Sequence, residues 1–352
     1  MHDTMGLTAP MENPLESKMN ARTSFYLAIG LSALATAAPA SASDLVLYDA
    51  LDFAGPVAKA FQAKTGLTVD VVEPGSTGET LGKIAAEGSN PQFDIVWLDG
   101  SAVMERMAAD HVLQAIPAAA YDKVAFTDLG KSLIPQSHAF LPTGTSTTAI
   151  EVNTKKVPAG KMPKSWADLQ SFAGGVAAKD PNLSGPAYQW LAGFFQTNGL
   201  DAGKALLAKT LTNKSLSGLS SGGKVNKAVL TGDASVGINQ DSAIFSKIAA
   251  GEPVVAVYPS EGSVSLPQGL GISAKTQHMD AARKFIDFVT SAEGQAAMQN
   301  GDDTDFFYIP IIKGINAKPG RETNITYTHL DDAVASAHET EWKQWYKASF
   351  VQ

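Results

Sequence analysis

Two short segments combine hydroxyl-bearing residues with glycine in the pattern that begins a helix. Ser76-Thr77-Gly78-Glu79 fits a capping box, in which the Ser76 hydroxyl accepts a hydrogen bond from the N–H of residue 79. Ser184-Gly185-Pro186 has a capping serine with proline at an early helical position. Helix starts also attract anions, and Gly185 would let a phosphate-like oxygen approach the backbone. We predict ligand binding through Ser76, Thr77, Ser184 and Gly185, with simple helix capping as the alternative.

Acidic and polar residues follow three apolar runs, where the carboxyl end of a strand would present them. They are Asp49 and Asp52 after residues 45–48, Asp99 and Ser101 after residues 93–98, and Asn239, Asp241 and Ser242 after residues 234–238. Asp241 could pair with a ligand ammonium, with Asp52 or Asp49 as further partners, or it could merely cap the next helix. Tyr188 could donate its hydroxyl to a ligand or simply pack. An anion site beside an ammonium site predicts a zwitterion such as an aminophosphonate.

Motifs of enzymes are present only in part. Residues 218–222 match G-x-S-x-G, but we expect neither an apolar strand before this segment nor a helix directly after it, so the nucleophile elbow lacks its context. The run from Gly218 to Lys224 nearly spells a phosphate loop, yet Val225 stands where Ser or Thr must hold Mg²⁺. The six His residues are scattered, without an H-E-x-x-H pair. We predict that the protein is not an enzyme, and an exported hydrolase using Ser220 or Ser221 is the weakest alternative.

Strands that alternate with helices would position these side chains. Residues 45–48, 67–72 and 93–98 are typical of strands, and helices are expected from Pro56 to Gly66 and over residues 81–87. This β-α-β-α-β order predicts a parallel sheet that is covered on both faces. Ligand-binding loops of such a sheet lie at the carboxyl ends of its strands.

A second alternating pattern follows and predicts a second lobe. The expected elements are strands at 145–152, 175–178 and 234–238, and helices that begin near Ser165, Pro186 and Val225, while a helix at 279–289 follows the return to the first lobe. Residues 259–272 would cross back toward the first lobe, so the chain crosses at least twice and a hinge is expected. We assign residues 43–146 and 262–352 to the first lobe and 147–261 to the second, while the C-terminal helices could pack on either.

The N-terminal 42 residues have the layout of a signal peptide. Lys18 and Arg22 precede an apolar run at residues 25–38, and Ala40-Ser41-Ala42 forms a small-x-small cleavage site. The candidate initiators are Met1, Met5, Met11 and Met19. We therefore expect export to the periplasm, with cleavage just before Ser43.

The composition restricts the partners. The chain has 27 Lys and Arg against 35 Asp and Glu, a formal charge of -8, which argues against a nucleic-acid partner because counterion release requires a basic stripe. It contains no Cys, so disulfides, thiolate metal sites and Cys catalysis are impossible. We expect a monomer with neither a cofactor nor a resident metal.

Several segments in order carry a family resemblance. They are residues 61–72, 75–79, 93–97, 163–169, 180–185, 232–239 and 257–262. Together they resemble the extracellular solute-binding proteins of ABC importers, in the branch that includes ferric-iron and 2-aminoethylphosphonate binders. The resemblance implies the α/β, two-lobed type II periplasmic binding fold, with a ligand cleft between the lobes. It also implies a permease in the inner membrane as partner, and an anion-binding helix start at Ser184-Gly185.

The resemblance also implies which ligands to compare. The iron binders of this branch use a His in the first loop and a Tyr pair after an Asn in the second lobe. Here Asp52 stands at the first position, and Asp241 with Ser242 follows Asn239 at the others. Because the phenolate donors are missing, we expect a phosphonate or phosphate-type anion such as 2-aminoethylphosphonate. Ferric iron, bound by carboxylates and an accompanying anion, is the alternative.

Overall fold

The computed structural model describes residues 43–351 except 173, 174, 213 and 329. The predicted signal peptide, its cleavage site and the candidate initiators all lie outside the described residues. Among the described helices, none is long and apolar enough to span a membrane.

The first lobe follows the predicted strand–helix alternation. Its leading elements are β1 (Leu45–Asp49), α1 (Ala54–Thr65), β2 (Val69–Val72), α2 (Thr77–Glu87), β3 (Ile95–Asp99) and α3 (Ser101–Ala109). Strand β1 pairs in parallel with both β2 and β3, so all three carboxyl ends lie at one edge of the sheet. Helix α2 begins at Thr77 because Ser76 caps it, four residues before the apolar pattern suggested. The expected β-α-β-α-β unit is confirmed.

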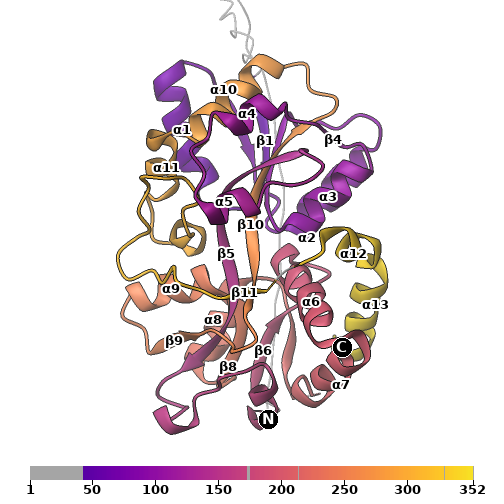
Figure 1. Ribbon diagram of the computed structural model, residues 1–352, viewed down its shortest axis with the longest axis vertical. Helices are drawn as coiled ribbons and strands as arrows, with labels where there is room; N and C mark the ends of the chain where they lie inside the picture. Colours follow the sequence, from indigo (N-terminus) through magenta and orange to yellow (C-terminus); the bar gives the residue numbers. More distant parts are fainter. Residues whose placement is uncertain (1–42, 173–174, 213, 329, 352) are drawn as a thin grey trace, which may run out of the picture. The chain divides into compact units, whose positions relative to one another are not determined.

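Two long strands join the lobes. Strand β5 (Phe140–Asn153) pairs antiparallel with β10 (Ser263–Ser273) in the first lobe and with β8 (Val236–Gln240) in the second. Strand β10 pairs antiparallel with β3 and shifts register between Gln268 and Gly269. Figure 1 shows β5 passing from one lobe into the other, with β10 beside it in the first lobe. The sheet is therefore mixed, because the connecting strands run against the parallel ones predicted from the sequence.

The second lobe repeats the strand–helix alternation. Its elements are η1 (Ala159–Lys161), η2 (Ala167–Phe172), β6 (Val176–Lys179), α6 (Gly185–Asn198), α7 (Leu200–Thr210), β7 (Leu216–Leu219), α8 (Gly222–Thr231), β8, α9 (Asp241–Ala249) and β9 (Val254–Val257). Strand β6 pairs in parallel with β7 and β8, so their carboxyl ends also share an edge. The helix expected at Ser165 is a short 3₁₀ turn over Ala167–Phe172, and Trp166 packs into the core just before it.

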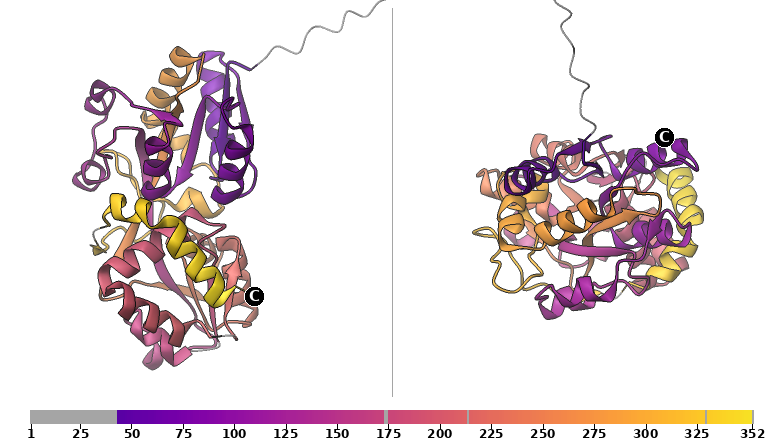
Figure 2. Two further views of the ribbon diagram at one scale, coloured as in Figure 1. Left: turned by 90° about the vertical axis from the view of Figure 1, so that its right-hand side faces the viewer. Right: turned by 90° about the horizontal axis from the view of Figure 1, so that it is seen from above.

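The remaining elements complete both lobes. They are β4 (Leu113–Gln114), α4 (Ala118–Asp122), α5 (Asp128–Ser132), α10 (Met279–Val289), α11 (Ala292–Met298), η3 (Thr304–Phe307), β11 (Tyr327–Thr328), α12 (Asp332–Ala337) and α13 (Glu339–Phe350). Helices α10 and α11 pack on α1 of the first lobe, whereas α13 packs on α6 and β7 of the second. Figure 2 shows α13 lying across the second lobe. The division of the chain into lobes at residues 146 and 262 stays a prediction, which we keep as a working definition.

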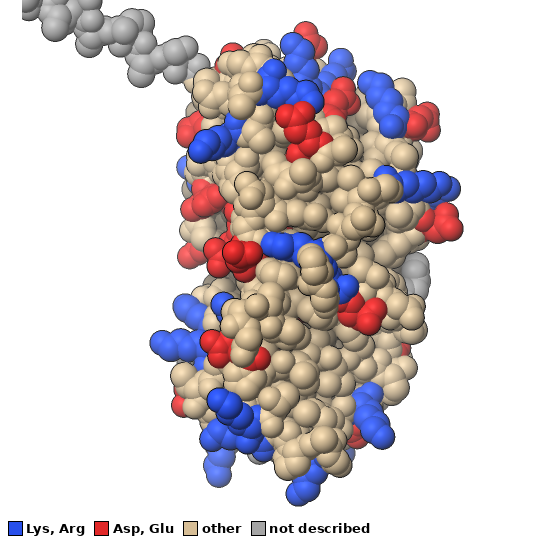
Figure 3. All heavy atoms as spheres, turned by 90° about the vertical axis from the view of Figure 1, so that its left-hand side faces the viewer, with Lys and Arg blue, Asp and Glu red and all other residues tan. Residues whose placement is uncertain are grey.

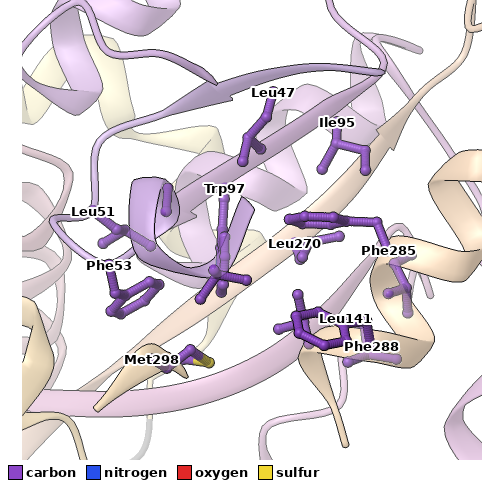
Figure 4. Packing of buried hydrophobic residues seen from close by; sticks show 14 of the residues in the cluster. Leu47, Leu51, Phe53, Ile95, Trp97, Leu141, Leu270, Phe285, Phe288 and Met298 are labelled. Carbon is purple, nitrogen blue, oxygen red and sulfur yellow. The ribbon is translucent and has the colours of Figure 1, made fainter. Parts of the chain in front are cut away.

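Each lobe has its own aromatic core. In the first, the ring centroid of Trp97 lies 4.7 Å from that of Phe53 and 6.2 Å from that of Phe285. Figure 4 shows these three side chains among their neighbours in the core. The Trp97 Nε1–H donates to Thr143 Oγ1 at 3.0 Å, so the buried indole is satisfied. In the second, Trp166 packs against Trp190. Both Trp97 and Trp166 belong to the core, as predicted, because each side chain is almost completely buried.

Candidate ligand-binding site

The carboxyl ends of the two parallel strand sets face each other across the lobes. The N–H of Gly78, in the first turn of α2, donates to the carbonyl of Leu183 at 3.3 Å. A Cβ added to Gly185 would lie 2.9 Å from both the carbonyl oxygen of Asp99 and Thr77 Cγ2. The starts of α2 and α6, far apart in sequence, are thus in contact. Two of the segments that the sequence analysis singled out are brought together.

Serine hydroxyls cap both helix starts. Ser76 Oγ accepts from the N–H of Glu79 at 3.2 Å, as in a capping box, whereas Glu79 Oε2 accepts from the Ser76 hydroxyl at 2.9 Å instead of from the Ser76 backbone N–H. Ser184 Oγ accepts from the N–H of Ala187 at 3.3 Å. Capping therefore accounts for one hydrogen bond of each hydroxyl. Both helices also point their starts, which carry partial positive charge, toward the junction between the lobes.

A buried lysine lies beside the start of α6. Lys179 ends strand β6, and its Nζ makes one hydrogen bond within the described residues, a long one of 3.5 Å to Gln240 Oε1. Burial lowers the pKa of Lys179 to about 8, against the raising effect of Asp99 and Asp305. An ammonium has three donors, so this cation retains hydrogen-bonding capacity at the junction.

Two carboxylates of the first lobe, those of Asp99 and Asp305, interact electrostatically with the lysine. Asp99 Oδ2 accepts from Gln240 Nε2 at 2.9 Å, while Asp99 Oδ1 is buried and has no hydrogen-bond partner among the described residues. Burial raises the pKa of Asp99 to about 7, although the hydrogen bond from Gln240 and the charge of Lys179 oppose this. Burial, followed by the charges of Asp99 and Asp52, raises the pKa of Asp305 well above its usual value.

Asp52 and Asp305 hold each other through the backbone. The N–H of Asp52 donates to Asp305 Oδ2 at 3.0 Å, and the N–H of Asp305 donates to Asp52 Oδ2 at 3.4 Å. Burial also raises the pKa of Asp52. Within the part of the chain that the structure describes, no group of three or more His, Cys, Asp or Glu is arranged to hold a metal. The two reciprocal hydrogen bonds place Asp52 and Asp305 side by side on the first-lobe wall.

The two lobes are in contact at their junction, where Gln240 Nε2 of the second lobe donates to Asp99 Oδ2 of the first at 2.9 Å. A cavity of about 10 Å³, with room for about one water molecule, lies within the second lobe against Lys179, Gln240, Pro186, Ala187 and Trp190. A larger groove of about 640 Å³ between α2 and α3 lies outside this junction and has an apolar floor that includes Leu81 and Met107. We identify the junction, which we call the cleft, as the candidate site because both sets of strand ends converge on it.

Sequence reasoning missed Lys179 and Asp305. Lys179 directly precedes a segment that carried the family resemblance, and its position at the end of a strand was a usable signal. Asp305 lies in the stretch 301–306, which is rich in Gly and Asp and reads as a surface loop. Only the fold of the chain brings η3 against α9 and so places Asp305 near the cleft.

Three other predicted site residues form hydrogen bonds with other groups of the protein. Ser101 Oγ donates to Asp332 Oδ1 at 2.6 Å, and the Tyr188 hydroxyl donates to the carbonyl of Ala335. Asn239 Nδ2 donates to Glu151 Oε2 at 2.9 Å. These contacts give Ser101, Tyr188 and Asn239 structural roles in this conformation, and ligand binding by them stays a prediction.

Two more candidates are fully buried near strand ends. Asp49 Oδ1 accepts from the N–H of Leu51 at 3.0 Å, and burial raises the pKa of Asp49 well above its usual value. Among the described residues, Asp49 Oδ2 and the buried Ser242 Oγ have no hydrogen-bond partner. Neither side chain hydrogen-bonds to Lys179 or Asp99 within the described part of the chain, so their binding roles also stay predictions.

Asp241 forms a buried ion pair. Its Oδ2 accepts from Arg321 Nη2 at 2.6 Å and from the Tyr258 hydroxyl at 3.0 Å, and its Oδ1 accepts from the N–H of Thr147 at 3.0 Å. Both charged side chains are 0% exposed. The sequence analysis considered Asp241 as a partner for ligand ammonium or as a helix cap, whereas here its carboxylate is occupied by Arg321.

The G-x-S-x-G segment has more regular surroundings than expected. Strand β7 leads into this segment, and helix α8 begins directly at Gly222. The expectation that neither a strand nor a helix adjoins the segment was therefore wrong. Ser221 caps α8, and Ser220 Oγ accepts from Lys224 Nζ at 2.8 Å. Among the described non-glycine residues, only His111 and His138 have positive φ, so Ser220 lacks the strained backbone of a nucleophile elbow.

Surface charge on one face is mixed. Figure 3 shows acidic and basic side chains interspersed among neutral areas on the face that it displays, rather than gathered in one basic stripe. The two lobes therefore present no strong single-sign field on that face.

Comparisons with solved structures reveal the same fold. The periplasmic binding protein AfuA from Actinobacillus pleuropneumoniae, solved with fructose-6-phosphate, is 22% identical, with a TM-score of 0.77 over 87% of this chain and 98% of that one. Iron-bound HitA from Pseudomonas aeruginosa is 21% identical, with a TM-score of 0.74 over 86% and 98%. A periplasmic thiamin binding protein is 19% identical, with a TM-score of 0.72 over 88% and 96%. These similarities confirm the two-lobed type II periplasmic binding fold.

Sequence comparisons identify the family. A protein of unassigned function from Haemophilus influenzae is 29% identical over 255 residues, which span 69% of this chain and 71% of that protein. The family model of the bacterial extracellular solute-binding proteins matches residues 57–328. The chain therefore belongs to the bacterial extracellular solute-binding proteins, the periplasmic components of ABC importers that bind a small ligand and work with a membrane permease.

Proposed function

We propose that this protein captures a small solute with a phosphonate or phosphate group, and that 2-aminoethylphosphonate is a suitable ligand. The observation that carries the proposal is the buried ammonium of Lys179, which makes one long hydrogen bond and lies beside the start of α6. A ligand oxyanion would receive charge-assisted hydrogen bonds from Lys179 and from the helix start at Ser184 and Gly185.

The opposite wall of the cleft suits a positive group. Within the described residues Asp99 Oδ1 has no hydrogen-bond partner, and Asp305, which is hydrogen-bonded to Asp52, interacts electrostatically with both Asp99 and Lys179. A ligand ammonium placed there would pair with carboxylates that are otherwise buried close to one another. The phosphonate and ammonium ends of a small aminophosphonate would thus each meet a group of opposite charge. We therefore propose Asp99 and Asp305, in place of Asp241, as the partners of the ligand ammonium.

Known proteins of this fold accommodate such chemistry. AfuA was solved with fructose-6-phosphate, so the fold accepts a phosphate ester, and HitA was solved with iron. In this chain Tyr258, a phenol of the second lobe, is occupied by Asp241 and Arg321. Phosphonate binding is therefore the better-supported reading, and iron analysis of the purified protein separates the two, since stoichiometric iron would favour the metal alternative.

A ligand of the proposed class is expected to raise the melting temperature. At about a hundred times its Kd, a ligand that binds only the folded state adds about 2.7 kcal/mol to the free energy of unfolding. Differential scanning fluorimetry with 2-aminoethylphosphonate, phosphoethanolamine, fructose-6-phosphate and inorganic phosphate measures this directly. A melting temperature that none of these compounds shifts would show that the ligand class is wrong.

Gly185→Ala is expected to weaken ligand binding by opposing closure. The new methyl group would lie 2.9 Å from Asp99 O and Thr77 Cγ2, and such overpacking costs about 1–3 kcal/mol. Affinity for 2-aminoethylphosphonate should fall by about fivefold or more when measured by calorimetry. The control is Gly55→Ala in α1, where nothing lies within 4 Å of the added atom. Equal affinity of both variants would contradict contact between the helix starts in the bound form.

A further inference from the structure

The amide group of Gln240 connects the two walls of the cleft. Its Nε2 donates to Asp99 Oδ2 of the first lobe at 2.9 Å and to Ser146 Oγ of β5 at 3.0 Å, which uses both protons of the amide. Its Oε1 faces the ammonium of Lys179 at 3.5 Å. One neutral side chain of the second lobe therefore presents donors to the carboxylate and an acceptor to the cation.

The backbone determines where this amide lies. Gln240 ends strand β8 and pairs with Thr148 of β5. Side chains of paired residues lie on the same face of a sheet, as do those of alternate residues along a strand, so Gln240 shares a face with Ser146. The contact with Asp99, in contrast, joins β8 to β3, which belong to different lobes. Separation of the lobes would therefore break this contact.

The charged ends of the proposed ligand need the same partners. Under the proposed function, the ligand ammonium meets Asp99 and the ligand oxyanion meets Lys179, and Gln240 now contacts both. The space beside Lys179 and Gln240 is about 10 Å³, enough for about one water molecule. A phosphonate group needs more space than this. The amide of Gln240 and the ligand therefore compete for one place.

We propose that Gln240 acts as an internal substitute for the ligand, holding the lobes of the ligand-free protein together until a ligand displaces its amide from Asp99 and Lys179. The proposal rests on the assignment of these two residues to the ligand site under the proposed function. Ligand binding is then an exchange of partners within the cleft. The apparent affinity is reduced by the fraction of molecules in which Gln240 occupies the place of the ligand.

Loss of the amide penalises the closed form alone. Asp99 is 5% exposed in the closed form, so its Oδ2 would stay buried without this donor, whereas water would solvate the same oxygen once the lobes separate. A hydrogen bond to an ionised group is also about twice as strong as one between neutral groups. Removing the amide should therefore lower the ratio of closed to open ligand-free molecules by at least about tenfold.

The first experiment measures closure with no ligand added. Because the chain has no Cys, Asn90→Cys and Lys227→Cys introduce unique labels on exposed positions of the two lobes. The labelled protein is unfolded, dialysed to remove bound ligand and refolded, and the distance between its spin labels is measured at pH 7.5. We expect mainly the shorter distance of the closed form in this parent protein.

Gln240→Ala and Gln240→Met, introduced into the labelled protein, should both shift the population toward the longer distance by at least about tenfold, because neither side chain can donate to Asp99. The matched control is Gln62→Ala, which removes an exposed glutamine of α1 and should behave like the parent. The proposal is overturned if the ligand-free parent is mainly open, or if both Gln240 variants keep the distances of the parent.

The second experiment measures competition by titration calorimetry with 2-aminoethylphosphonate. Gln240→Ala should bind about threefold or more tightly than the parent, since its ligand-free form is no longer held closed. Gln240→Met should bind more weakly than Gln240→Ala, because its longer side chain still fills the place of the ligand. Weaker binding by Gln240→Ala than by the parent would show that the amide assists the ligand, which contradicts the proposal. If the parent does not bind this compound, the proposed ligand class is wrong, and the distances still decide the role of Gln240.

Discussion

Replacing Lys179 with methionine is expected to reduce the affinity for 2-aminoethylphosphonate by at least about 30-fold. Removing one partner from a buried, hydrogen-bonded charge pair costs about 2–5 kcal/mol, and each 1.4 kcal/mol is tenfold in Kd. Methionine has a similar length, so the packing of the stem is retained while the ammonium is lost. Titration calorimetry on the parent and Lys179→Met at pH 7 provides the measurement.

Two further variants sharpen this result. Lys209→Met removes a lysine of α7 outside the cleft and should leave the affinity unchanged, since its side chain is exposed. Lys179→Arg keeps the charge and should retain part of the affinity. If Lys179→Met binds 2-aminoethylphosphonate as tightly as the parent protein, the anion is held elsewhere and the proposed site is wrong.

Breaking the buried ion pair between Asp241 and Arg321 is expected to lower the stability of the protein strongly. Arg321→Met leaves the Asp241 carboxylate without its charged partner at 0% exposure, and such a change costs about 3–5 kcal/mol. Arg321 Nε also donates to the carbonyl of Phe307 at 2.6 Å, so the same side chain ties η3 to α9. Urea denaturation at pH 7 measures the loss in the free energy of unfolding.

The matched control for this prediction is Arg283→Met, which removes an exposed arginine of α10 and should change the free energy of unfolding by less than about 1 kcal/mol. A loss for Arg321→Met as small as that of the control would mean that the pair contributes little to holding η3 against α9.

Local features of the fold could be predicted from the sequence. Ser76 and Glu79 indicate the start of α2 because capping depends on residues three apart, and the apolar spacing of residues 279–289 gives the bounds of α10. The alternation of strands and helices predicts both lobes. These signals work because each depends on a short stretch of chain.

The residues that fill the cleft could not be predicted in the same way. Lys179 and Asp305 are separated by more than a hundred residues, and nothing in either local pattern says that η3 packs against the second lobe. Asp241 and Arg321 are likewise 80 positions apart. Strand β7 was missed for another reason: its sequence, Leu-Ser-Gly-Leu, has two apolar residues and a glycine, and it is paired on one side with β6.

A crystal structure of the protein grown with 2-aminoethylphosphonate tests the central claim most directly. The account predicts closed lobes, with phosphonate oxygens at hydrogen-bonding distance, about 2.7–3.2 Å, from Lys179 Nζ and the start of α6, and the ammonium facing Asp99 and Asp305. The account would be contradicted by a phosphonate that lies outside the cleft. An empty cleft in a crystal grown with a saturating concentration of the ligand would contradict it as well.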